Sequence, residues 1–226
     1  MAQVWYTRHT VNEKYFDKID TEDKAYWLGF ITADGWISGW RLCIELQSKD
    51  REHLEKFKKA IEFTGPISDR TLKNTCKHHK KDQYFGSRIV ICRKKIVNSL
   101  IKLGITENKS LTVTECGQVP EHLLSHYYRG IFDGDGSYGM LNKGNQPRVR
   151  VVATLSLINS FRQFIARNNI QTKSKPRLKH KNSEIYEYGL GGRILVAKVI
   201  NLLFKDANTY LDRKYKIVQS LMSEGN

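Results

Sequence analysis

The sequence lacks the features that mark membrane, secreted and disulfide-stabilised proteins. None of its apolar runs approaches the roughly 18–20 residues needed to cross a bilayer, and no signal-peptide hydrophobic segment follows Met1. The four cysteines are scattered and form no CxxC pair, which favours a reduced chain over a disulfide framework. We therefore expect an intracellular protein that is neither secreted nor attached to a membrane.

Two further absences concern metal sites and disorder. The segment CKHHK at Cys76 holds potential zinc ligands, but no second ligand pair lies at a usable spacing, so a structural zinc is not favoured. The 226 residues include only four prolines and no low-complexity tract. The chain is therefore long and apolar enough for one or two domains with a real core.

Acidic residues are scarce relative to basic ones. The chain has 38 Lys and Arg residues against 23 Asp and Glu residues, which gives a formal net charge of +15. Such an excess favours a polyanionic partner, and nucleic acid is the first candidate. An anionic membrane surface is the weaker alternative, because no basic amphipathic helix stands out.

One phrase occurs twice in the chain. YWLGFITADGWIS in the first half and YYRGIFDGDGSYG in the second align Asp34 with Asp135. In each half an alternating strand pattern follows and runs into an amphipathic helix pattern, as RLCIELQSKDREHLEKF and as RVRVVATLSLINSFRQF. Alternation of this kind is typical of a sheet with one covered face and one open face.

The remaining elements repeat as well. Further strands are expected near 66–72, 84–91, 174–179 and 185–190, and each half closes with a helix, in KKIVNSLIKLG and in RILVAKVINLLF. The sequence thus predicts an α+β fold of two pseudo-symmetric αββαββα repeats with antiparallel sheets. The expected divisions are an N-terminal arm over 1–20, a first repeat over 21–110, a linker over 111–120 and a second repeat over 121–226.

Each repeated phrase is expected to lie on a helix that carries a stripe of small residues. The helices are predicted over 22–34, with Asp20 or Thr21 as N-cap, and over 121–134. Spacing of four residues places two small residues on one face, and such a stripe allows two helix backbones to approach closely. Because glycine inside a helix costs about 1 kcal/mol relative to alanine, a packing reason is indicated. The small residues are Gly29, Ala33, Gly130 and Gly134.

Packing of these helices on each other would bring Asp34 and Asp135 side by side at two helix ends, each before a glycine that suits a helix C-cap. The two carboxylates would repel each other, and a divalent cation would remove that penalty. In a basic chain this arrangement predicts metal-assisted cleavage of a phosphodiester. Turn signals after two helices are the alternative interpretation of ADG and GDG, but the shared surroundings of both copies favour a site.

At these residues the chain resembles the LAGLIDADG homing endonucleases in their single-chain, two-motif form. The similarity runs through WLGFITADG and YRGIFDGDG and extends over about residues 21–222. It implies that the motif helices form a pseudo-twofold interface and that the sheets form a saddle on double-stranded DNA. It also implies a monomer that makes a double-strand break in a long, pseudo-palindromic target, as in intron homing, with Mg²⁺ or Mn²⁺ as cofactor.

The resemblance assigns Asp34 and Asp135 as catalytic residues and as the metal ligands. Whether a backbone group near position 33 joins them is left open. Thr32 stands where the family usually has an acid, and the second copy has Asp133 at that place. That position is not a metal ligand in the family, so the departure puts little in doubt.

Four further catalytic residues follow from the resemblance. Gln47 and Thr154, at the end of the second strand of each repeat, would orient water. Lys109 and Lys214, after the last helix of each repeat, would support the site with positive charge. Thr154 is shorter than Gln47, so the two strands of the DNA are expected to be cut at unequal rates.

The open sheet faces are expected to read DNA in the major groove, which carries the richer base code. The candidate contacts are Ser38, Arg41, Glu45, Arg70, Arg88, Lys143, Arg148, Arg150, Lys175, Arg177 and Lys179. Two alternative functions use the same fold. One is an intron RNA-splicing maturase, and the other is a DNA-binding protein that does not cleave.

Overall fold

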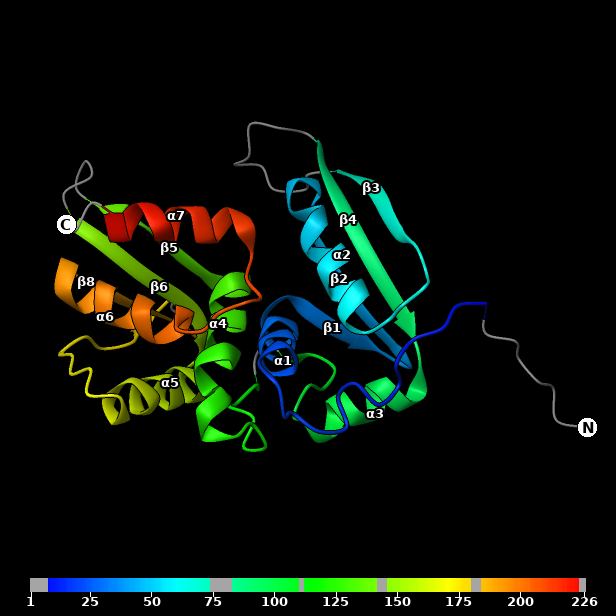
Figure 1. The fold of residues 1–226 in the computed structure, drawn as a ribbon, viewed down its shortest axis with the longest axis horizontal. Coiled ribbons are helices and arrows are strands. Elements are labelled where there is room, and N and C mark those ends of the chain that lie inside the picture. Colours follow the sequence, from blue (N-terminus) through cyan, green and yellow to red (C-terminus); the bar gives the residue numbers. More distant parts are fainter. Residues whose placement is uncertain (1–7, 74–82, 110–111, 142–145, 180–183, 224–226) are drawn as a thin grey trace, which may run out of the picture.

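The computed structural model describes residues 8–73, 83–109, 112–141, 146–179 and 184–223. Two four-stranded antiparallel sheets flank a central pair of helices (Figure 1). Each half runs helix, strand, strand, helix, strand, strand, helix, which confirms the predicted fold class. Among the described residues, no helix is both long and apolar enough to cross a membrane.

The two halves contain equivalent elements. The first comprises α1 (Glu22–Asp34), β1 (Gly35–Ser38), β2 (Arg41–Gln47), η1 (Ser48–Asp50), α2 (Arg51–Ala60), β3 (Ile67–Lys73), β4 (Gln83–Cys92) and α3 (Lys94–Lys102). The second comprises η3 (Glu121–Leu123), α4 (Leu124–Asp135), β5 (Gly136–Leu141), β6 (Gln146–Thr154), α5 (Leu155–Arg167), β7 (Arg177–Leu178), β8 (Ile185–Gly191) and α6 (Arg193–Phe204), followed by α7 (Asp212–Ser223). The strand orders β1-β2-β4-β3 and β5-β6-β8-β7 correspond.

Two elements of the second half differ from the prediction. The edge strand β7 is shorter than the expected strand over 174–179, because Pro176 has no N–H to donate and the Ser174 hydroxyl donates to the carbonyl of Gly189 on β8 (2.6 Å). Helix α7 was not expected, although its residue Val218 is buried and Tyr215 packs against the core. Within the described residues, it gives the second half an α-helix that has no counterpart in the first.

The motif helices α1 and α4 touch through their backbones, which confirms the predicted interface. A Cβ atom at Gly29 would lie 1.9 Å from the carbonyl oxygen of Tyr127, and one at Gly130 would lie 2.1 Å from that of Tyr26. No side chain larger than hydrogen fits at either place without moving backbone. The small-residue stripe therefore sets how closely the two repeats approach.

Gly35 and Gly136 are the C-cap residues of α1 and α4, but both are extended (φ −80° and −89°) and do not adopt the left-handed conformation common there. The reason for glycine is steric. A Cβ atom at Gly35 would lie 2.7 Å from Ile31 Cγ2, and one at Gly136 would lie 2.5 Å from the carbonyl oxygen of Phe132. In each repeat the chain therefore passes from helix to strand directly after the aspartate.

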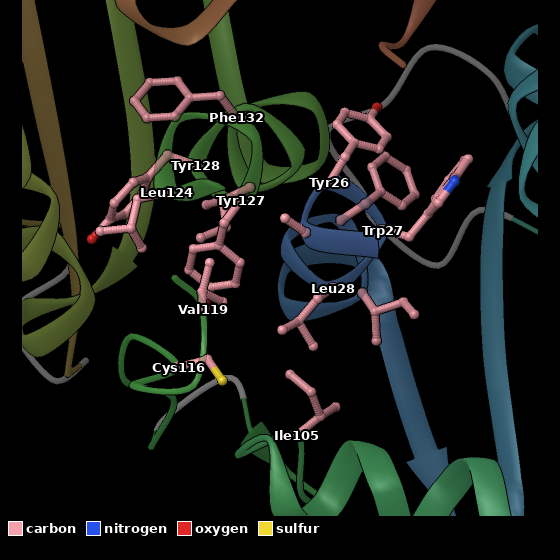
Figure 2. Packing of buried hydrophobic residues seen from close by; sticks show 14 of the residues in the cluster. Tyr26, Trp27, Leu28, Ile105, Cys116, Val119, Leu124, Tyr127, Tyr128 and Phe132 are labelled. Carbon is pink, nitrogen blue, oxygen red and sulfur yellow. The ribbon is translucent and has the colours of Figure 1, made fainter. Parts of the chain in front are cut away.

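Aromatic side chains surround the helix pair. Figure 2 shows Tyr26 and Trp27 on α1 and Tyr127 and Tyr128 on α4 within one buried cluster. The cluster continues into the segment that joins the repeats, where Val119 is buried beside α4. The predicted linker therefore contributes to the core.

Part of the predicted N-terminal arm also belongs to the core. Tyr15, Phe16 and Ile19 are buried, and the backbone N–H of Asn12 donates to the carbonyl of Ile61 after α2 (2.8 Å). The described part of the arm, residues 8–20, consequently packs on the first repeat.

One buried arginine joins α1, α4 and the segment after α6. The guanidinium of Arg129 donates to Glu22 Oε1 (2.5 Å), to the carbonyl of Thr209 (2.9 Å) and to that of Leu203 (2.8 Å). Its charge is fully buried and paired, so removing either partner would leave an uncompensated ion. This contact holds the start of α1 against the second repeat.

Replacing Gly130 with Ala should destabilise the protein, although Ala favours a helix by about 1 kcal/mol relative to Gly. The new Cβ atom would meet backbone atoms of Tyr26 and Phe30, so we expect the free energy of unfolding to fall by about 1–3 kcal/mol. The measurement is urea unfolding followed by circular dichroism. Gly139→Ala is the control, since a Cβ atom there has nothing within 4 Å. A Gly130→Ala protein as stable as the wild type would show that the helices are not in backbone contact.

Candidate functional site

Asp34 and Asp135 stand at the junctions where α1 and α4 pass into strands. The side chain of Asp34 is half-buried. It lies against α4, as its Oδ2 atom would be 3.2 Å from a Cβ atom built at Gly134. Asp135 is the next residue along and is exposed. The two acids predicted from the repeated phrase are therefore neighbours across the helix interface.

The surroundings of this acid pair disfavour two negative charges. Burial raises the pKa of Asp34 to about 6, and the negative charge of Asp135 adds to the rise. Burial by the surrounding protein also raises the pKa of Asp135, although its side chain is open to solvent, while Lys109 and Lys214 oppose the rise. The positive charge that the chain supplies does not fully compensate the pair, so the site favours a further cation.

Lys214 caps the C-terminal end of α4. Its buried ammonium donates to the carbonyl oxygens of Phe132 (2.9 Å), Gly134 (2.9 Å) and Gly136 (2.7 Å). These carbonyls lie in the last turn and just beyond it, where a cation is favoured by the helix dipole. The lysine thus supports the backbone on both sides of Asp135.

Lys109 has the corresponding position at the end of α1. Its buried ammonium donates to the carbonyl of Ala33 (3.1 Å), the residue before Asp34. Burial lowers the pKa of Lys109 and of Lys214, and nearby acids limit this fall. The structure therefore brings both predicted lysines to the acid pair, and it adds a capping role that spacing alone does not indicate.

The predicted water-orienting residues differ in their surroundings. Gln47 is exposed at the end of β2. Thr154, at the end of β6, is buried, and its hydroxyl donates to the carbonyl of Val113 (2.6 Å) while accepting from the N–H of Leu157 (3.2 Å). Thr154 is the N-cap of α5. Because its only proton is committed to Val113, Thr154 could orient a water only by accepting from it, and its predicted role stays a prediction.

The acid at the sixth motif position points away from the site. Asp133 is buried, and its Oδ2 accepts from the Tyr26 hydroxyl (2.8 Å) and from the N–H of Leu211 (2.7 Å). Burial raises the pKa of Asp133 to about 6. In the first copy, Thr32 donates to the carbonyl of Leu28 inside its own helix. Both side chains are therefore hydrogen-bonded to partners in the protein interior.

An ion pair that the sequence did not reveal adjoins the site. Arg213, next to Lys214, binds the buried Asp50 of η1 through Nε (3.0 Å) and Nη2 (2.9 Å). The bidentate geometry fixes the start of α7 on the first repeat. The charge of Asp50 also contributes to the raised pKa of Asp34. No local pattern could have predicted a contact between residues so far apart in the chain.

The donor set at the helix ends fits a hard divalent cation. Carboxylate oxygens are ligands that Mg²⁺ prefers, and it commonly takes one or two of them and completes its shell with water and substrate phosphate. Within the described ranges, no group of three or more His, Cys, Asp or Glu side chains could enclose an ion. The pair of Asp34 and Asp135 therefore suits a site completed by a phosphate group, and not a closed protein cage.

Three of the predicted DNA contacts lie together on the open face of the first sheet. Glu45 accepts from Arg70 Nη1 (3.1 Å), and Arg88 Nε lies 4.0 Å from the same oxygen. The guanidinium of Arg88 also lies 5.1 Å from the ring centre of Trp36. Trp36 was not among the predicted contacts, although its place directly after the motif was visible in the sequence.

The open face of the second sheet has a similar cluster with different residues. Glu187 accepts from Arg148 Nη2 (3.0 Å) and from Arg150 Nη1 (3.2 Å). Arg150 also donates to the Ser137 hydroxyl (3.2 Å). Glu187 was missed by the sequence analysis, although strand alternation on β8 places it on the open face.

The other predicted contacts lie around these clusters. Arg148, Lys175 and Arg177 line a hollow of about 590 Å³ together with Lys173, and the positive charge of Lys179 opposes the rise in the pKa of Asp135 that burial causes. Ser38 and Arg41 are exposed where β1 turns into β2. Lys143 lies outside the described residues.

Comparisons with known proteins agree with the fold described above. Residues 21–104 match the family model of the LAGLIDADG-like domain. The homing endonuclease I-WcaI, solved bound to its DNA recognition sequence, is 14% identical, with 91% of each chain covered and a TM-score of 0.58. Meganuclease I-SmaMI, solved bound to uncleaveable DNA, is 15% identical over 88% of this chain and 89% of its own, with a TM-score of 0.55.

The fold is not confined to proteins named as nucleases. The N-terminal LAGLIDADG domain of DUF199/WhiA is 13% identical, with 85% of this chain and 89% of its own covered and a TM-score of 0.51. No curated protein matches the chain in sequence.

The fold and the paired acids define a two-repeat α+β protein with one composite site between its halves. Residues 21–104, in the first repeat, match the model of the LAGLIDADG-like domain, and about nine tenths of the chain has the fold of LAGLIDADG homing endonucleases.

The two lysines should contribute unequally to stability. Lys214→Met removes a donor from three carbonyl oxygens, of which that of Phe132 keeps the N–H of Gly136, whereas Lys109→Met removes a donor from one. We expect the free energy of unfolding to fall by about 2–3 kcal/mol for Lys214→Met and by about 1–2 kcal/mol for Lys109→Met. Equilibrium urea unfolding of both variants measures the difference. Equal losses, or a reversed order, would contradict the capping role.

Proposed function

We propose that this protein is a homing endonuclease that makes a double-strand break in a long, partly palindromic DNA target. The observation that carries the proposal is the meeting of Asp34 and Asp135, one from each repeat, at two adjoining helix ends with raised pKa values. An acid pair that needs a cation suits Mg²⁺, with Mn²⁺ as a substitute. Phosphodiester cleavage is the reaction for which such a site is best arranged.

Double-stranded DNA is the proposed substrate. The net charge of +15 suits a polyanion, and both sheets expose arginines on their open faces, as major-groove recognition requires. Several matched structures, I-WcaI among them, are bound to DNA. Because one chain carries both halves of the site, we propose that it acts as a monomer in the compartment that holds its DNA target.

We assign each residue of the site a separate role in cleavage. Asp34 and Asp135 would hold the cation, which when bound activates water and neutralises charge on the phosphate. Lys109 and Lys214 keep the two aspartates in place by capping the helices, and their charges favour the approach of a phosphate. Gln47 has an exposed amide that can orient water, whereas Thr154 has no free proton. The two strands should therefore be cut at different rates.

The alternatives differ from this proposal in what the acid pair does. A non-cleaving DNA-binding protein of this fold gains nothing from two like-charged groups held together, since they weaken binding to phosphates. An RNA-splicing maturase would bind its intron through the same basic faces, so splicing of that intron with the chain added is the assay that detects it.

Asp34→Asn and Asp135→Asn should each abolish double-strand cutting and leave DNA binding within about threefold of the wild type. Each change removes a metal ligand but keeps the size of the side chain, and it removes one negative charge near the phosphates. The measurement is cleavage of DNA that spans the insertion site of the gene, with Mg²⁺ and with EDTA, beside a gel-shift assay.

Asp206→Asn is the matched control for these variants, since Asp206 is exposed after α6 and lies outside the site. It should cut like the wild type. Full cutting by either site variant would show that the acid pair is not the catalytic centre. Binding by the wild type without any Mg²⁺-dependent cleavage would favour the non-cleaving alternative.

A further inference from the structure

The strands that follow the two acids carry different residues at an equivalent place. β1 and β5 begin directly after Asp34 and Asp135, and the second residue of each strand is Trp36 in one and Ser137 in the other. In the register of the sheets, Trp36 pairs with Cys43, whereas Ser137 pairs with Arg150. On each open face, Trp36 or Ser137 is the first residue of its strand after the acid.

In the first repeat an aromatic ring stacked with a guanidinium occupies this place. The Trp36 ring is 36% exposed, and Arg88 lies over it at 5.1 Å. Arg88 Nη2 is 3.4 Å from the sulfur of buried Cys43, and Arg88 Nε is 4.0 Å from Glu45 Oε2. The stacking and the two flanking groups hold the Arg88 side chain in one orientation before any ligand arrives.

In the second repeat the equivalent place is polar and has no ring. Ser137 accepts from Arg150, whose side chain is 44% exposed and is paired with Glu187. Opposite Arg150 on β8 stands Gly189, where the first sheet has Val90 opposite Cys43. The two repeats therefore offer opposite chemistry at corresponding places, apolar with a stacked arginine in one and hydrophilic in the other.

Each base pair presents a distinct pattern in the major groove. Thymine is marked by its C5-methyl group, which apolar side chains contact, and guanine by two acceptors, which an arginine can bind together. The half-exposed ring can contact the methyl group of a thymine, and the guanidinium beside it can bind the two acceptors of an adjacent guanine. A serine beside an arginine has no apolar surface for a methyl group.

We propose that Trp36 is a specificity-determining residue that contacts the C5-methyl group of a thymine in the half-site bound by the first repeat. Arg88, held against the ring, reads the adjacent guanine. The second repeat has no thymine preference at the equivalent base pair, so the target departs from palindromy close to its centre. This inference rests on the proposed DNA function and names one determinant of its specificity.

The test starts with selection of binding sites by the full chain from a random duplex library, in EDTA so that no DNA is cut. Thymine next to guanine should be enriched in one half-site near the centre. That thymine is then replaced by deoxyuridine, which removes only the methyl group. We expect the Kd of the wild type to rise about fourfold, the effect of one buried methyl group, and the Kd of Trp36→Ser to stay unchanged.

Trp40→Ser is the control variant, since Trp40 is a 53% exposed ring in the turn after β1. It should keep the fourfold response to deoxyuridine. A wild type that binds both duplexes equally, or a Trp36→Ser protein that still distinguishes them, would overturn the inference. The deoxyuridine comparison changes only the DNA, so it holds even if a variant folds poorly. If the enriched target has no thymine next to a guanine near its centre, the inference is overturned and the proposed function is not. If no sequence is enriched at all, the proposed function is contradicted as well.

Discussion

The backbone contact between α1 and α4 is the constraint on which the rest of the molecule depends. Gly29 and Gly130 each face a carbonyl of the other helix at a distance that excludes any side chain. Because the helices touch along this line, their ends arrive together, and Asp34 reaches Gly134 beside Asp135. A separation larger by one methyl group would part the acids and also tilt the two sheets, whose first strands leave directly from the helix ends.

Bringing two helix C-termini and two carboxylates together concentrates negative charge, and the chain offsets this locally. Lys109 and Lys214 place buried ammonium groups on the terminal carbonyls, where they satisfy acceptors that a helix end leaves free. Arg213 holds Asp50 and so anchors the helix that carries Lys214. The compensation is incomplete, as the raised pKa of Asp34 shows. A further cation at this place would lower the pKa of both acids, as the proposed metal ion would.

The repeat and the alternating strands were predictable because they depend on local pattern. The period of two in RLCIELQ and in RVRVVAT fixes which face is covered, and the paired phrases fix the helix interface. Thr154 could not be judged in this way, because its hydroxyl is taken by Val113 from a distant part of the chain. The length of β7 likewise depends on one hydrogen bond from Ser174. These contacts are made by the tertiary fold and leave no periodic signal, whereas Trp36 and Glu187 lie at strand positions that alternation places on the open faces.

The inner frame and the open faces are subject to different constraints. Inside, Gly29 and Gly130 have corresponding roles because any side chain would strike backbone. On the open faces, Trp36 and Ser137 share a place without sharing chemistry, since Trp36 stacks with Arg88 whereas Ser137 accepts from Arg150. The matched glycines thus keep the two acids paired, as the proposed cleavage of both DNA strands requires. Surface divergence leaves each repeat free to recognise a different sequence, so a chain with two matching halves is suited to a target whose halves do not match.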